Sequence, residues 1–291
     1  MRAAADVRAA LEARQRRAEP GLIEETGTIE VEGLRLFFHL WRPDGEARRV
    51  GVSIAHSFVD HAILQAAEAA FGRAAARAGI AVILVQAPGA GDSEGAPEAC
   101  TMADRIRAVA AGWAELRRRV PETERPCFLG AALGGLVAAH AAAGNDQACL
   151  ALWQPSLHGD AYWADVRRML QLAMVRERRG EPRAADGDGP APDPDAVLDR
   201  EGLADVLGMR VTAAQLQELR DAGRGLDDGT VAGPALLVTA ADRDERAAVR
   251  RIVRGPVEVA VGPGRRTAWH LGRPGGLDVA GPTVDWLLRV G

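Results

Sequence analysis

The chain has 291 residues, a formal net charge of −4, and a composition that is 47% hydrophobic and 26% charged. This is the composition of a globular chain that can bury a sizeable core. Arginine and acidic residues are mixed along the whole sequence, so no basic face for nucleic acid is predicted. No apolar run approaches the length of a membrane span.

Three cysteines, Cys100, Cys127 and Cys149, are odd in number and form no C-x-x-C pair. Neither a disulfide framework nor a cysteine zinc site is therefore predicted. Residues 1–20 lack the apolar core of a signal peptide, and we expect them to form an amphipathic surface helix. These features together predict a cytoplasmic protein.

Strand and helix patterns alternate along most of the chain. Two strands joined by a tight turn at Glu32-Gly33 are expected first. Apolar strands are then expected at 51–58, 81–88, 127–130, 148–155, 234–242 and 257–262, and helices at 61–78, 102–119, 134–143, 244–251 and 277–289. Strands that alternate with helices predict an α/β fold with a mainly parallel central sheet and helices on both faces.

A charge-rich segment, residues 157–230, interrupts this alternation after the sixth expected strand. Its pattern predicts helices at 162–179, 195–206 and 212–222, with a loop at 187–195. The organisation predicted is therefore an N-terminal helix (1–20), a core formed by 21–156 and 231–291, and a helical insertion at 157–230.

The segment Gly130-Ala131-Ala132-Leu133-Gly134-Gly135 follows the fifth expected strand and opens a helix. Such a turn is typical of the nucleophile elbow, G-x-S-x-G, in which the tip has a strained backbone and its neighbours must lack bulk. An alanine would not need that strain for its own sake. A plain strand-to-helix turn with incidental glycines is the alternative, and the position after the fifth strand favours the elbow.

A second glycine-rich loop, Pro88-Gly89-Ala90-Gly91-Asp92-Ser93-Glu94-Gly95, follows the fourth expected strand. It lacks the lysine of a Walker loop and the spacing of a dinucleotide fingerprint, so a phosphate-binding loop is rejected. Ser93 is interpreted as a turn-stabilising hydroxyl. We expect no cofactor and no metal.

The order of elements from about 28 to 289 resembles the α/β-hydrolase fold, with 157–230 in the place of the helical cap. The resemblance places Ala132 at the nucleophile position. It implies that His270, after the last strand, is the general base, and that Asp244, after the seventh strand, orients it. Asp242 is the second choice for the acid. The chain order nucleophile, acid, base is that of this fold.

The segment His56-Ser57-Phe58 stands where these hydrolases carry an H-G-x segment beside the oxyanion. The resemblance therefore implies that the backbone N–H groups of Phe58 and Leu133 form an oxyanion hole. Ser57 replaces the usual glycine. His56 is interpreted either as a strand-capping residue or as a residue that lines the site.

Covalent acyl transfer needs a nucleophile, and Ala132 supplies none. Three hypotheses follow, in order of preference. The alanine replaces a serine, and the chain is an inactivated esterase, thioesterase or acyltransferase. Alternatively, the alanine is natural, and the protein is a pseudo-hydrolase that binds a small molecule or a protein partner. Finally, His270 could act as a base on water or on the substrate without a covalent step.

The segment ALWQPSLHG (151–159) and the stretch 205–222 resemble the exosortase-system-associated hydrolases, a bacterial family that often departs from the serine elbow. Trp153 and Trp163 could line an apolar acyl pocket, although core packing is an alternative for each. The expected substrate is a small-molecule ester or thioester, free or carrier-bound. The sequence does not indicate an oligomeric state.

Overall fold

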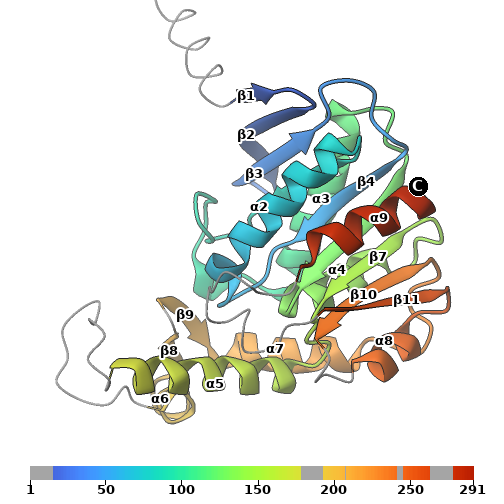
Figure 1. Cartoon of the computed structure of the whole chain (residues 1–291). Coiled ribbons are helices and arrows are strands. Elements are labelled where there is room, and N and C mark those ends of the chain that lie inside the picture. Colours follow the sequence, from blue (N-terminus) through green and yellow to red (C-terminus); the bar gives the residue numbers. More distant parts are fainter. Residues whose placement is uncertain (1–15, 178–192, 207, 241–244, 263–277) are drawn as a thin grey trace, which may run out of the picture.

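The computed structural model describes residues 16–177, 193–206, 208–240, 245–262 and 278–291, with the backbone alone for 172–177. In this part of the chain nine strands form one sheet, in the order β1-β2-β3-β5-β4-β6-β7-β10-β11 (Figure 1). Their bounds are β1 Arg16–Glu19, β2 Leu22–Val31, β3 Leu34–Arg42, β4 Val50–Ala55, β5 Ala81–Val85, β6 Arg125–Ala131, β7 Cys149–Trp153, β10 Ala235–Ala240 and β11 Val257–Gly262. From β5 to β11 every adjacent pair is parallel, and β1, β2 and β3 add antiparallel strands at one side.

Helices cover both faces of this sheet. On one face α2 (His61–Arg77) packs beside α9 (Ala280–Val290), and on the other α3 (Met102–Arg119) packs beside α4 (Leu133–Ala142) (Figure 1). A further helix, α8 (Arg246–Ile252), joins β10 to β11. The α/β fold with a mainly parallel sheet and helices on both faces is therefore confirmed. None of the helices in the described ranges is both long enough and apolar enough to cross a bilayer.

The insertion at 157–230 lies across the carboxyl ends of the parallel strands (Figure 1). It holds α5 (Gly159–Glu177), α6 (Pro194–Glu201) and α7 (Ala213–Arg224), and α5 packs on α7. The expected helix at 195–206 is wrong at its end, because Gly202 has a φ of 71° and stops α6. A two-stranded hairpin follows, β8 (Leu203–Val206) and β9 (Met209–Thr212), so the insertion is not purely helical.

The expected N-terminal helix is wrong at residues 16–19, which form β1 instead; residues 1–15 lie outside the described ranges. β1 pairs antiparallel with β2, where Arg16 lies 3.9 Å from Glu25, and Glu19 of β1 lies 3.0 Å from Arg77 at the end of α2. Pairing with an existing strand edge therefore overrides the local helical pattern. Because of β1, the cap follows the seventh strand of the described chain rather than the sixth.

Candidate active site

Ala132 forms the tip of a sharp turn between β6 and α4. Its backbone has a φ of 47° and a ψ of −120°, a conformation that L-residues rarely adopt. The N–H of Ala132 donates to the Trp153 carbonyl at 3.2 Å, and its carbonyl accepts from the N–H of Ser156 at 2.9 Å. The turn that the sequence pattern predicts as a nucleophile elbow therefore has the strained tip of one, held in place by the end of β7.

The glycines beside the tip are required by close backbone contacts. A Cβ on Gly130 would lie 2.0 Å from the carbonyl oxygen of Gly134, and a Cβ on Gly134 would lie 2.4 Å from that of Ala55. A Cβ on Gly135 would lie 2.6 Å from the side chain of Pro155. These distances are far below van der Waals contact, so only glycine allows α4 to start this close to β4 and β6.

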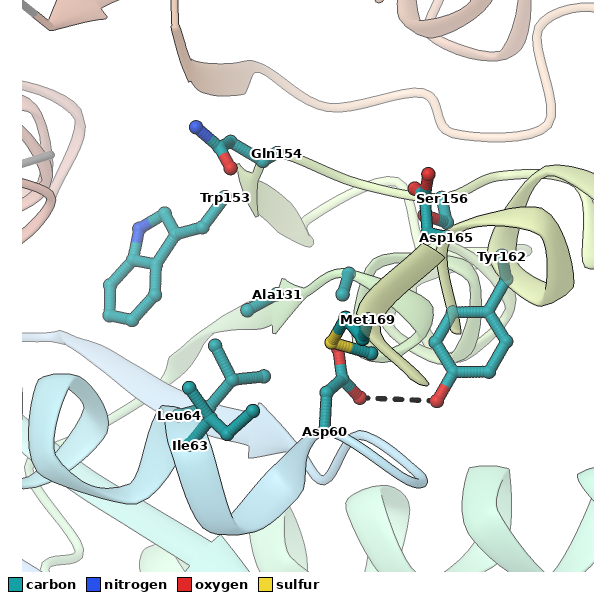
Figure 2. Close-up of a pocket in the computed structure, with 11 residues that line it drawn as sticks. Asp60, Ile63, Leu64, Ala131, Trp153, Gln154, Ser156, Tyr162, Asp165 and Met169 are labelled. Atoms are coloured by element: carbon teal, nitrogen blue, oxygen red, sulfur yellow. Dashed lines mark hydrogen bonds between the residues drawn. The ribbon is translucent and has the colours of Figure 1, made fainter. Parts of the chain in front are cut away.

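A pocket lies against Ala132, between the start of α2, the end of β7 and the cap helix α5 (Figure 2). We call it the elbow pocket. Its lining is mostly apolar, with a few polar groups that include two carboxylates. The described residues that line it are Asp60, Ile63, Leu64, Ala131, Ala132, Trp153, Gln154, Ser156, Tyr162, Asp165 and Met169.

Asp60 brings a buried carboxylate into the elbow pocket. It accepts a hydrogen bond from the Ser57 hydroxyl at 2.6 Å and another from the Tyr162 hydroxyl of the cap at 3.2 Å (Figure 2). Tyr162 in turn accepts the N–H of Val59 at 2.9 Å. Burial raises the pKa of Asp60, and hydrogen bonds from Ser57, Tyr162 and the backbone N–H groups of Asp60 and Phe58 oppose that rise.

The comparisons with known proteins agree with this geometry. No protein-family model matches the chain, and no curated protein matches it. Est1E from Butyrivibrio proteoclasticus, solved with ferulic acid bound, is similar with a TM-score of 0.56 at 16% sequence identity, over 90% of this chain and 98% of that chain. DcsB, solved with a substrate analogue, is similar with a TM-score of 0.57 at 17% identity, over 92% of this chain and 97% of that chain. The protein has the α/β-hydrolase fold.

In an α/β-hydrolase fold, two backbone N–H groups beside the elbow serve the oxyanion. The two expected here belong to Phe58 and Leu133, and their loops adjoin, since a Cβ on Gly134 would lie 3.6 Å from the Ser57 nitrogen. The Asp60 carboxylate adjoins the same loop, because it accepts the Ser57 hydroxyl at 2.6 Å.

The other expected site residues separate into two groups. Trp153 lines the elbow pocket, and its indole N–H donates to Thr283 at 2.9 Å. Trp163 does not line it: its indole N–H donates to Asp195 at 2.6 Å, inside the cap. The prediction that Trp163 lines the pocket is therefore wrong, because the turn of α5 that presents Tyr162 to the core points the next residue toward α6.

His56 also lies away from the elbow pocket. It is 4% exposed, and its ring centroid lies 4.6 Å from that of His61. Burial, with the positive charge of His61 and Arg105, lowers its pKa well below the usual range. Ser57 takes part in the site indirectly, through its hydrogen bond to Asp60.

The remaining predictions concern Ser93, the acid and base of the triad, and metal binding. Ser93 holds its loop, as predicted: its hydroxyl donates to the Gln86 carbonyl at 3.0 Å and accepts the Phe37 N–H at 2.9 Å. Asp242, Asp244 and His270 lie outside the described residues. In the described part of the chain no three His, Cys, Asp or Glu side chains are arranged to hold a metal ion.

Sequence reasoning missed Asp60 and Tyr162. An aspartate directly before a helix is normally interpreted as an N-cap, yet the Asp60 side chain makes no cap bond to α2 and turns into the pocket. Tyr162 looked like an ordinary member of a cap helix. Only the tertiary contact between the cap and the core reveals either role.

Proposed function

We propose that the elbow pocket is the acyl site of an α/β-hydrolase-type protein that acts on esters or thioesters, with residue 132 at the nucleophile position. The strained backbone of Ala132 carries this proposal. A non-glycine residue in such a conformation costs on the order of 1–3 kcal/mol and usually marks a functional site. The methyl group of alanine has no chemical use for this strained conformation. A hydroxyl at the same tip would be presented to a substrate carbonyl in the pocket.

The chemistry of the form with serine at position 132 follows the triad scheme. The serine oxygen attacks the acyl carbonyl while His270 takes its proton, and Asp244, or Asp242 in its place, orients the imidazole. The leaving alcohol or thiol receives that proton, and water or another acceptor then removes the acyl group. The Leu133 N–H stabilises the oxyanion. The apolar residues Leu64 and Met169 would contact the acyl chain.

The WQP segment supports a site at this place. Trp153 and Gln154 line the elbow pocket, and Gln154 has a φ of 42°, a second strained residue beside the first. The segment also resembles that of the exosortase-associated hydrolases, the type of protein that the alternative with a natural alanine would represent. The bound ferulic acid of Est1E, which shares the fold, supports a small organic ligand.

A second candidate is favoured by Asp60. In this alternative the alanine is natural, and the protein binds an acyl compound or a partner without hydrolysing it. The nucleophile is lacking, and the buried carboxylate of Asp60, which accepts hydrogen bonds from Ser57 and Tyr162, lines the pocket beside Ala132. A pocket that lacks a nucleophile and is lined by a buried carboxylate is suited to binding rather than turnover.

Hydrolysis of p-nitrophenyl esters and acyl thioesters of several chain lengths separates the two candidates. We expect Ala132→Ser to be active, Ala132→Ser with His270→Ala to be inactive, and Ala132→Ser with His158→Ala to stay active, since His158 is an exposed histidine. Adding Asp60→Asn to Ala132→Ser raises kcat if the carboxylate opposes the oxyanion. A folded Ala132→Ser protein that is inert on all substrates, with and without Asp60→Asn, would overturn the hydrolase proposal.

The unsubstituted chain completes the test. Calorimetric binding of uncleaved substrates to it, together with an inert Ala132→Ser variant, would establish the binding protein. Turnover by the unsubstituted chain that His270→Ala abolishes would instead establish base catalysis without a covalent intermediate.

A further inference from the structure

A second cavity, of about 300 Å³, lies on the other side of α2 from the elbow pocket. We call it the α2 cavity. Strands β2, β3 and β5 and the loop after β4 form its walls, and α2 closes it. The residues that matter for its chemistry are Glu24, His39, His56, Glu68 and Arg73. Its volume is at the lower end of the range for small-molecule sites.

Two buried side chains that line this cavity have polar atoms without a hydrogen-bond partner. Glu68 is 2% exposed, and its Oε2 has no hydrogen-bond partner; His56 is 4% exposed, and neither ring nitrogen has one. Buried polar groups are nearly always satisfied, and a charged or polar atom without a partner is costly. Two such side chains on one cavity therefore indicate a bound molecule that supplies the missing hydrogen bonds.

The charges around Glu68 show what kind of molecule fits. The carboxylate of Asp60, at the start of α2, raises the pKa of Glu68 in addition to burial. On the other walls, burial lowers the pKa values of His39, on β3, and of His56, so both imidazoles are neutral. The ring of His61, whose centroid lies 4.6 Å from that of His56, is likewise shifted downward in pKa by burial.

The cation on the cavity wall is already engaged. Arg73 on α2 donates to Glu24 on β2 at 2.6 Å, and a second bond joins them at 3.3 Å. Arg105 lies over the Phe58 ring and donates to the Ser57 carbonyl. Among the described residues, the cavity atoms without a hydrogen-bond partner are thus one carboxyl oxygen of Glu68 and the two ring nitrogens of His56.

We propose that the α2 cavity binds a small primary amine in its ammonium form, with Glu68 as the counter-ion and a ring nitrogen of His56 as a second acceptor. An ammonium group has three N–H donors, which match the unpartnered oxygen of Glu68 and the unprotonated ring nitrogen of His56. An anion would find no free cation on the described walls, because Arg73 is already paired with Glu24. This site is separate from the elbow pocket and does not depend on the function proposed for that pocket.

Binding of an amine at this site is linked to proton release. Burial, aided by Asp60, raises the pKa of Glu68 to about 8, so at neutral pH the carboxyl must lose its proton to serve as counter-ion. We therefore expect the affinity to rise about tenfold per pH unit between pH 6 and 8 and to level off above, while the amine itself stays protonated up to about pH 10. A neutral ligand would show no such rise.

Isothermal titration of the 291-residue chain with propylammonium chloride, at pH 6, 7, 8 and 9 and fixed ionic strength, tests the proposal. We expect saturable binding that tightens toward pH 8, no binding of 1-propanol, and at least a tenfold loss of affinity in Glu68→Gln. Glu46→Gln, which removes an exposed carboxylate, should bind like the unsubstituted chain. Asp60→Asn should retain binding with a weaker affinity.

A spectroscopic titration keeps the test independent of how the variants fold. The carboxyl carbon of Glu68, followed by NMR in the unsubstituted chain, should titrate near pH 8 alone and clearly lower with saturating propylammonium. Absence of binding, equal binding of 1-propanol, an affinity that Glu68→Gln leaves unchanged, or an unmoved Glu68 titration would each overturn the proposal and leave the cavity to water.

Discussion

Replacing Glu68 by glutamine should remove a pH-dependent loss of stability. The Glu68 carboxyl is buried beside the Asp60 carboxylate, and burial together with that charge raises its pKa to about 8, against 4.5 for an ordinary glutamate. Between these two values the folded protein holds a proton that the unfolded chain releases. The unfolded state then binds fewer protons, so the free energy of unfolding falls as the pH rises.

The size of the effect follows from the two pKa values. One pKa unit corresponds to about 1.4 kcal/mol, so the folded state loses about 5 kcal/mol between pH 4.5 and pH 8 because of this one group. Glutamine has the same shape as a protonated glutamate and does not ionise. Glu68→Gln should therefore match the unsubstituted chain in stability near pH 4.5 and exceed it by about 5 kcal/mol at pH 8.

Urea unfolding followed by tryptophan fluorescence, at half-unit steps from pH 4.5 to 8.5, measures this difference. Glu46→Gln is the matched control, because its carboxylate is exposed, and its curve should follow that of the unsubstituted chain at every pH. A gap between Glu68→Gln and the unsubstituted chain that stays constant with pH would refute the reasoning, since it would mean that Glu68 ionises normally in the folded state.

Three further substitutions test the geometry of the elbow and the cap, each by urea unfolding. Ala132→Gly should raise the free energy of unfolding by about 1 kcal/mol, because glycine adopts a positive φ without strain; a lower value would contradict the strained tip. Gly134→Ala should lower it by about 3 kcal/mol, since the new Cβ would lie 2.4 Å from the Ala55 oxygen, whereas Gly45→Ala, with open space, should be nearly neutral. Tyr162→Phe should cost about 1–3 kcal/mol, because Asp60 and the Val59 N–H lose a partner; no loss would mean that the cap is not held there.

The parallel core could be predicted because its signals are local. Apolar runs of strand length alternate with helical periodicity, and the structure keeps most of those boundaries within a few residues. The elbow was predictable for a different reason. A Cβ on Gly130 or Gly134 would lie only 2.0 or 2.4 Å from a backbone oxygen. Only glycine fits at these positions, so the steric requirement is visible in the sequence itself.

Other features depend on partners distant in sequence. The strand over 51–58 ends early, at Ala55, because Ser57 and Asp60 bond each other and turn the chain toward the pocket. Asp60 and Glu68 both look like ordinary polar residues of a helix start and a helix surface, and only the packing of α2 on the sheet buries them. The acid and base of the triad remain predictions, since Asp242, Asp244 and His270 lie outside the described residues.

Strand β1 affects how readily copies of the protein associate through the edge of the sheet. The border of a sheet offers unpaired backbone groups onto which another chain can add a strand. Without β1 that border would be the ten-residue β2, long enough to template such growth. β1 covers part of it with four residues, RRAE, which are mostly exposed and carry opposite charges. A short, charged edge strand is a poor template for another strand. A variant that lacks residues 1–19 should therefore be prone to aggregate through β2.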